Sequence, residues 1–318
     1  MYPAISPLLH VPDGFLSPAV TAITWLLAAI AVWLAAHRAQ TRFRERLIPL
    51  AGIMAAFIFA AQMINFPIAG GTSGHLVGAA LAAIVLGPWM GILVMTAVIA
   101  LQALLFQDGG LVAMGANILI MGVVPALGGY GLYRAVINHS RRLQLATAGV
   151  AAWFSVMAAA LLTALLLGFS GTFSLRIAVP AMLGVHALIG LGEALITVAA
   201  LSFIMNSRPQ LLQESAATGS RGWIIAGGAI VLLVIFLSPF ASGLPDGLEW
   251  VAQENGFLQA AREAPYQIMP DYTIPALGDT AVSTIVAGAV GAAIAGGGAW
   301  VVARLLPRLR SRKERAGS

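Results

Sequence analysis

The chain has 318 residues, of which 59% are hydrophobic and 9% are charged, with a mean hydropathy of +0.91 and a formal net charge of +5. Soluble domains carry about 25% charged residues, so this composition excludes a soluble protein and indicates an integral membrane protein with several spans. The absence of cysteine excludes disulfides and thiolate metal sites, and the only lysine, Lys313, follows no glycine-rich loop, which excludes an ATP-binding P-loop.

Apolar runs bounded by turn residues predict the helices in chain order. The stretch 75–105 stands apart, because 31 residues of α-helix measure about 46 Å, whereas the hydrocarbon core of a membrane measures about 30 Å. Gly87–Pro88 interrupts it, so we expect helices over 75–86 and 88–105 that form two crossings or a re-entrant hairpin inside the bundle. The other seven of nine expected helices lie near 18–35, 47–66, 111–135, 146–168, 180–205, 222–240 and 282–303.

Basic clusters set the expected orientation. Residues 37–46, 133–142 and 304–315 are rich in arginine and predict the cytoplasmic side, with the lipid bilayer rather than nucleic acid as the neighbouring surface. Counting crossings from these clusters places the N-terminus outside. The expected fold is an all-α protein of the cell (inner) membrane. A seven-helix bundle with an extracytoplasmic N-terminus is followed by two further transmembrane helices joined by an extracytoplasmic loop.

Two polar segments organise the C-terminal third. Residues 206–221 form a predicted cytoplasmic linker, and residues 241–281 form the predicted extracytoplasmic loop. This loop holds half of the acidic residues in the chain against a single Arg262, so it would attract cations. Alternatively, these acids only keep an exposed loop hydrated. They are Asp246, Glu249, Glu254, Glu263, Asp271 and Asp279.

Two histidines fall at the extracytoplasmic edge of the predicted bundle. His10 lies in a polar N-terminal segment, and His75 ends the glycine-rich stretch "NFPIAGGTSGH". Two imidazoles at one membrane face suit a borderline transition metal such as nickel, cobalt, copper or zinc. His37 and His139 lie in the basic loops, where we expect them to be hydrated.

Buried polar residues form a second set of candidates. Gln62 and Asn65 lie three residues apart in one predicted helix, and His186 and Glu193 lie two helical turns apart on one face of another. Ionisable residues inside a membrane are usually functional. The alternative is a structural hydrogen-bond network that holds the bundle together. Gln102 and Asn117 belong to the same set.

Small residues recur four apart in "AGIMAAFIFAAQ", a spacing that lets helices pack closely. Packing within the chain explains this pattern, and so does a docking face for another membrane subunit. We expect the docking face to comprise Ala51, Ala55, Ala56 and Ala60.

Several motifs together resemble a known family. The stretches "HVPDGFLSP", "FAAQMINFPIAGGTSGHLVGAALAAIVLGPWMGILVMT", "QALLFQDGGL" and "HALIGLGEALIT" are similar to the substrate-binding membrane subunit (S component) of cobalt and nickel energy-coupling-factor (ECF) transporters, the CbiM/NikM family. "GLPDGLE" at 243–249 resembles the small accessory subunit, fused here in the NikN manner. The resemblance implies a metal-binding transport unit over 9–205 and an accessory PDGLE-type unit with two transmembrane helices over 222–306.

The resemblance also implies a function. Members capture Ni²⁺ or Co²⁺ outside the membrane and deliver it inward with a coupling membrane subunit and two cytoplasmic ATPases. The metal is the transported substrate, and we expect a transport subunit rather than an enzyme. Two alternatives stay open: a secondary metal transporter that works alone, and an intramembrane enzyme with His186 and Glu193 as acid–base partners. The sequence does not separate nickel from cobalt.

The family's metal ligands are the N-terminal amine, the amide nitrogen and ring Nδ1 of a second-position histidine, and a histidine after the glycine-rich loop. Here the histidines correspond to His10 and His75, and we expect Asp13 to orient a liganding imidazole. The amine would belong to Leu9, but eight residues precede it. We therefore expect the working chain to begin at residue 9, because an internal amide must lose a proton to bind metal.

Overall fold

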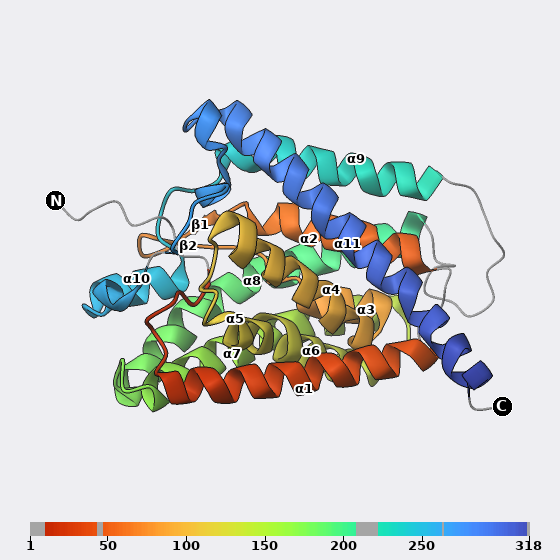
Figure 1. The fold of residues 1–318 in the computed structure, drawn as a ribbon, viewed down its shortest axis with the longest axis horizontal. Coiled ribbons are helices and arrows are strands. Elements are labelled where there is room, and N and C mark those ends of the chain that lie inside the picture. The colour runs from red at the N-terminus through yellow and green to blue at the C-terminus, as the bar shows by residue number, and fades with distance from the viewer. Residues whose placement is uncertain (1–9, 43–46, 208–221, 263, 317–318) are drawn as a thin grey trace.

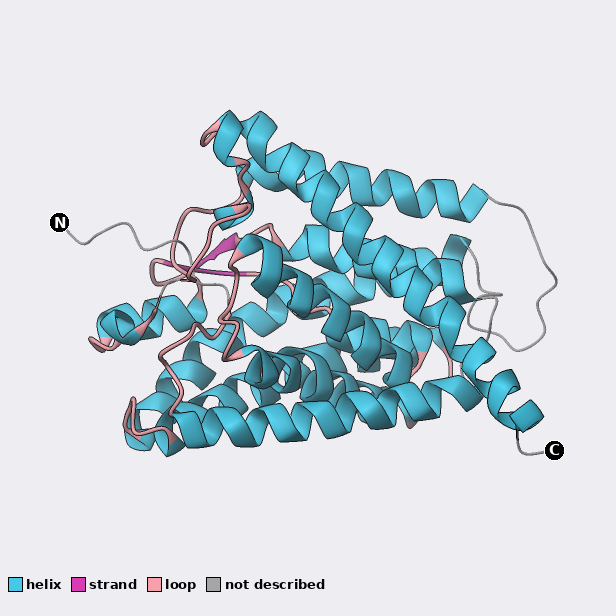
Figure 2. Cartoon of the chain, in the orientation of Figure 1, coloured by secondary structure: helices cyan, strands magenta, loops and turns pink. Residues whose placement is uncertain are grey.

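The computed structural model describes residues 10–42, 47–207, 222–262 and 264–316 (Figure 1). Leu9, Glu263 and most of the predicted linker therefore lie outside the described residues. Long helices run roughly along one axis of the molecule, as the cyan ribbons of Figure 2 show. Their bounds are α1 (Pro18–Arg42), α2 (Ile48–Gln62), α3 (Ala79–Leu86), α4 (Pro88–Leu101), α6 (Val124–Arg134), α7 (Arg141–Phe169), α8 (Leu175–Ser207), α9 (Gly222–Leu237) and α11 (Ala281–Ala316).

The helices confirm an all-α membrane protein. Within the described residues, six helical segments are long and apolar enough to cross a membrane, and α2 and α9 are shorter apolar helices. The six segments are Pro18–Gln40, Pro88–Phe106, Met114–Arg134, Arg141–Phe169, Leu175–Asn206 and Ala281–Leu305.

The break at Gly87–Pro88 is confirmed, because α3 ends at Leu86 and α4 begins at Pro88. All eight residues of α3 are buried, and Arg38 near the end of α1 lies 5.1 Å over the ring of Trp89. The turn between α3 and α4 therefore lies close to the basic C-terminal end of α1. The predicted start at residue 75 is wrong, since α3 begins at Ala79 and the preceding backbone bonds to side chains of other helices.

A short β-hairpin that was not predicted precedes α3. Its strands β1 (Phe66–Ile68) and β2 (Thr72–Gly74) pair antiparallel with Phe66 opposite Gly74. Gly70 and Gly71 turn the chain at φ of 95° and 80°. The hairpin lies at one end of the bundle beside α10 (Gly247–Glu254), and we call this the hairpin end (Figure 1). Asn65 precedes the hairpin and is not on α2, which corrects the prediction that it shares a helix with Gln62.

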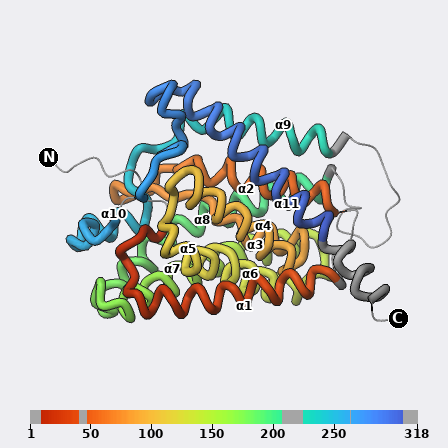
Figure 3. Tube along the Cα trace, in the orientation of Figure 1, coloured from red at the N-terminus to blue at the C-terminus, as the bar shows by residue number. Residues whose placement is uncertain are grey.

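The two C-terminal helices pack on the N-terminal bundle through α2 (Figure 3). Gly52 of α2 and Gly296 of α11 come so close that a Cβ on Gly52 would lie 2.9 Å from the Gly296 carbonyl oxygen. The small residues thus serve packing within the chain, and the predicted docking face is wrong. Ala51, Ala55 and Ala60 have no exposed surface, and Ala56 faces Gly296.

Two π-helices flank the loop that reaches the site. The π-helix η2 (Gln102–Phe106) continues α4, and η3 (Ile118–Val123) follows α5 (Met114–Asn117) and leads into α6. Single-turn π segments inside longer helices occur often at functional sites. Between them, loop 107–113 lies against the N-terminal segment that carries His10.

Candidate metal centre

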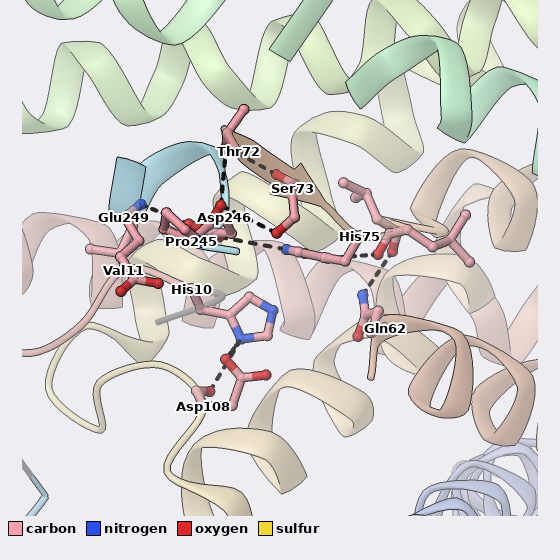
Figure 4. Close-up of polar contacts among 12 residues, drawn as sticks. His10, Val11, Gln62, Thr72, Ser73, His75, Asp108, Pro245, Asp246 and Glu249 are labelled. Carbon is pink, nitrogen blue, oxygen red and sulfur yellow. Dashed lines mark hydrogen bonds and ion pairs between the residues drawn. The ribbon is translucent and has the colours of Figure 1, made fainter. Parts of the chain in front are cut away.

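His10 and His75, 65 residues apart in sequence, meet at the hairpin end (Figure 4). Their ring centroids are 5.7 Å apart, and the rings stand nearly perpendicular at 88°. Both residues are buried, with exposed fractions of 2% and 9%. The structure therefore brings together the two histidines that the sequence pattern selected.

Hydrogen bonds to loop 107–113 and α5 hold the N-terminal segment in place. The Asn117 side chain accepts from the Val11 N–H at 3.1 Å and donates to the Val11 carbonyl at 2.9 Å, and Gly110 N–H donates to the same carbonyl. A Cβ at Gly110 would lie 2.0 Å from Asp13 Oδ1, so only glycine fits there. This clamp fixes the backbone immediately after His10.

Asp108, which the sequence reasoning missed, is the carboxylate that holds His10. Its Oδ1 lies 2.9 Å from His10 Nδ1, which also faces the Asp108 carbonyl at 3.1 Å. Burial alone would lower the pKa of His10, but the adjacent carboxylate raises it overall. Asp13, expected to orient an imidazole, instead accepts a hydrogen bond from Ala113 N–H at 2.8 Å. His10 Nε2 is buried and has no hydrogen-bond partner among the described residues.

Glu193 and Gln62 anchor the backbone that follows His75. The N–H groups of Val77 and Gly78 donate to the two Glu193 oxygens at 2.6 and 2.8 Å, and Gln62 donates to the Val77 carbonyl at 2.9 Å. Both carboxylate oxygens of Glu193 are thus engaged by backbone donors. This corresponds to the predicted structural network, not to acid–base partnership with His186.

His75 and His186 are each oriented by a backbone carbonyl. His75 Nδ1 donates to the Leu76 carbonyl at 3.0 Å, and His186 Nδ1 donates to the Met182 carbonyl at 2.8 Å. With the proton on Nδ1, Nε2 carries the lone pair that a metal needs. His75 Nε2 lies 4.0 Å from Asp246 Oδ2. All three histidines line one cavity of about 60 Å³, which is room for an ion and a few waters.

Asp246 comes from the C-terminal part of the chain. Ser73 of the hairpin donates through its N–H to the Pro245 carbonyl and through its hydroxyl to the Leu244 carbonyl, both at 2.8 Å. Asp246 caps α10 by accepting from Glu249 N–H at 2.7 Å. Burial raises the pKa of the Asp246 carboxyl to about 7. The segment that contains "PDGLE" therefore forms one wall of the cavity.

The arrangement suits a divalent cation. The imidazoles of His10 and His75 and the carboxylate of Asp246 line the cavity, and Asp108 holds the His10 ring. Imidazole nitrogen favours borderline transition metals. Within the part of the chain that the structure describes, no three histidine or acidic side chains are grouped closely enough to hold an ion by themselves. Further ligands would then come from the main chain or from water.

Comparisons with known proteins agree with this chemistry. The model of the CbiM family, described as cobalt uptake substrate-specific transmembrane region, matches residues 10–211, and a PDGLE domain matches 220–308. A putative fused nickel transport protein NikMN from Archaeoglobus fulgidus is 36% identical over 90% of this chain and 95% of its own length. The fused nickel transport protein NikMN of Rhodobacter capsulatus is 34% identical over 77% of this chain and 76% of its own. The crystal structure of a truncated transition metal transporter superposes with a TM-score of 0.57 at 34% identity, covering 62% of this chain and 99% of that one.

Proposed function

Since the chain belongs to the CbiM family of cobalt uptake transmembrane proteins and is a multi-pass membrane protein with a C-terminal PDGLE domain, we propose that it captures Ni²⁺ or Co²⁺ at the extracytoplasmic face. The observation that carries this proposal is the meeting of His10 and His75 in a buried cavity flanked by Asp108 and Asp246. The metal is the transported substrate. The relatives of this chain bear the names of transport proteins rather than enzymes, in keeping with a transport role for the unit over 9–205.

Main-chain nitrogens are proposed as the remaining ligands. If residue 9 is the first residue, its amine, the amide nitrogen of His10 and the His10 ring form adjoining chelate rings, and His75 completes four nitrogens. A four-nitrogen plane suits Ni²⁺. Binding through Nδ1 would require the His10 ring to turn, so that Nε2, which has no hydrogen-bond partner among the described residues, donates to the Asp108 carboxylate in place of Nδ1.

Metal binding by the purified protein tests this proposal. We expect the protein from its native host to bind about one Ni²⁺ or Co²⁺ per chain, with the visible spectrum of square-planar nickel, and its intact mass to place the first residue at 9. A protein that binds neither metal contradicts capture. A chain that begins at Met1 and still binds through four nitrogens contradicts only the role of the amine.

We propose that transport requires a coupling membrane subunit and two cytoplasmic ATPases, with residues 222–306 as an accessory unit. Uptake of radioactive nickel by cells that express this chain should then be lost when those subunits are deleted. Uptake that persists at the full rate would favour the alternative of a secondary transporter that works alone.

Thiol labelling tests the proposed orientation. The chain has no cysteine, so an introduced one is the only target. We expect Ala241→Cys and Thr280→Cys at the hairpin end to react with an impermeant reagent on intact cells. The exposed Ser140→Cys, before α7, serves as the matched control and should react only after lysis. The opposite pattern would place the metal cavity on the cytoplasmic side.

A further inference from the structure

Tyr272 reaches the metal centre from the C-terminal unit. It ends the short helix η7 (Pro270–Tyr272), is 7% exposed, and donates its hydroxyl to Asp108 Oδ2. The other oxygen of that carboxylate faces His10 Nδ1. We propose that Tyr272 is a positioning residue for metal binding, which fixes the Asp108 carboxylate and through it the imidazole of His10. This inference rests on the proposed function.

The Tyr272 hydroxyl also joins the two histidines through one hydrogen-bonded chain. Gln102 Nε2 donates to the Tyr272 oxygen at 3.0 Å and to Gln62 Oε1 at 3.0 Å. Gln62 in turn donates to the carbonyl of Val77, two residues after His75. A displacement of Tyr272 should therefore shift His10 through Asp108 and the His75 backbone through the two glutamines.

Packing holds Tyr272 in place. Its ring stacks on Phe106 at 4.9 Å and lies 5.9 Å from Phe59, and the nearby Met269 N–H donates to the Leu105 carbonyl at 3.0 Å. Tyr272 has a φ of 57°, a conformation that a residue with a Cβ keeps only when its surroundings enforce it. The ring of Tyr272 thus packs against η2, and this packing holds its hydroxyl at the Asp108 carboxylate.

The chemistry of the hydroxyl suits this role. Burial and the charge of Asp108 raise the pKa of Tyr272 well above its usual value, so the phenol stays protonated and donates. Without that donor, one oxygen of a buried carboxylate would lose its partner and the carboxylate would be free to rotate. Docking of the C-terminal segment and metal binding should therefore strengthen each other, because such coupling is reciprocal.

Tyr272→Phe tests the proposal, because it removes the hydroxyl and keeps the ring packing. We expect Ni²⁺ affinity to fall about tenfold, the low end of the range for partners of metal ligands. Tyr266→Phe is the matched control. Its hydroxyl donates to the Leu104 carbonyl at 2.9 Å in the same segment, away from Asp108, so affinity should not change.

A double-mutant cycle separates positioning through Asp108 from a general structural role. In an Asp108→Asn background, with titration extended to millimolar metal, Tyr272→Phe should change affinity less than twofold. A tenfold loss in both backgrounds, or none in the parent chain, would overturn the proposal. If the parent chain binds neither Ni²⁺ nor Co²⁺, the proposed function itself fails.

Discussion

Replacing His75 with alanine is expected to weaken Ni²⁺ binding by more than about 100-fold while the protein still folds. Changes to the partners of metal ligands already cost 10- to 100-fold, so loss of a ligand should exceed that range. The Nε2 atom of His75 lies 4.0 Å from Asp246 Oδ2 at the cavity, and its Nδ1 donates to the carbonyl of the adjacent residue, Leu76. His10→Ala should have the same effect.

Affinity should be measured by competition with a coloured chelator, and folding by the melting temperature in detergent. His139→Ala is the matched control, because this histidine is exposed in the loop before α7 and lines no part of the cavity. If His75→Ala binds Ni²⁺ as tightly as the parent chain, the cavity is not the metal centre. Equal losses in His139→Ala would point to a non-specific effect of removing imidazoles.

The sequence predicted the helices well where hydrophobic length decides the structure. Membrane spans and the break at Gly87–Pro88 follow from apolar length and from the backbone limits of proline, both of which are local. The predicted start of α3 was wrong because Val77 and Gly78 bond through their backbone groups to the side chains of Glu193 and Gln62, from distant helices. No local pattern contains that information.

The residues of the candidate site were likewise predicted only where position along the chain was enough to find them. His10 and His75 were found because topology places both at one end of the bundle. Asp108 and Tyr272 were missed as partners because 164 residues separate the two, and only the packed fold joins them. The acidic residues of the predicted loop differ from one another. Asp246 is buried in the cavity wall, as attraction of a cation would require, whereas Asp279 is exposed, as hydration of the loop would require.

The docking prediction was wrong for a related reason. Small residues four apart show that a helix approaches closely, but not which chain supplies it. In this protein the partner is α11, whose Gly296 meets Gly52 of α2. A fused C-terminal unit thus occupies a surface that the sequence pattern alone would leave open to another subunit.

Glu193→Ala is expected to destabilise the protein and to weaken metal binding together. The substitution leaves the N–H groups of Val77 and Gly78 buried without acceptors, at about 1–3 kcal/mol each, so the free energy of unfolding should fall by about 2–6 kcal/mol. Because these groups fix the backbone that follows His75, Ni²⁺ affinity should fall at least about tenfold. Glu193→Gln keeps one oxygen acceptor and should give intermediate losses in both quantities.

Thr197→Val is the matched control for Glu193. Thr197 lies one turn further along α8, is equally buried, and its hydroxyl has no hydrogen-bond partner among the described residues. We expect it to leave both the melting temperature and Ni²⁺ affinity close to those of the parent chain. If Glu193→Gln keeps full affinity while the melting temperature falls, Glu193 supports the bundle without setting His75. If both quantities fall together in the order parent, Gln, Ala, the carboxylate holds the loop in the geometry that the metal requires.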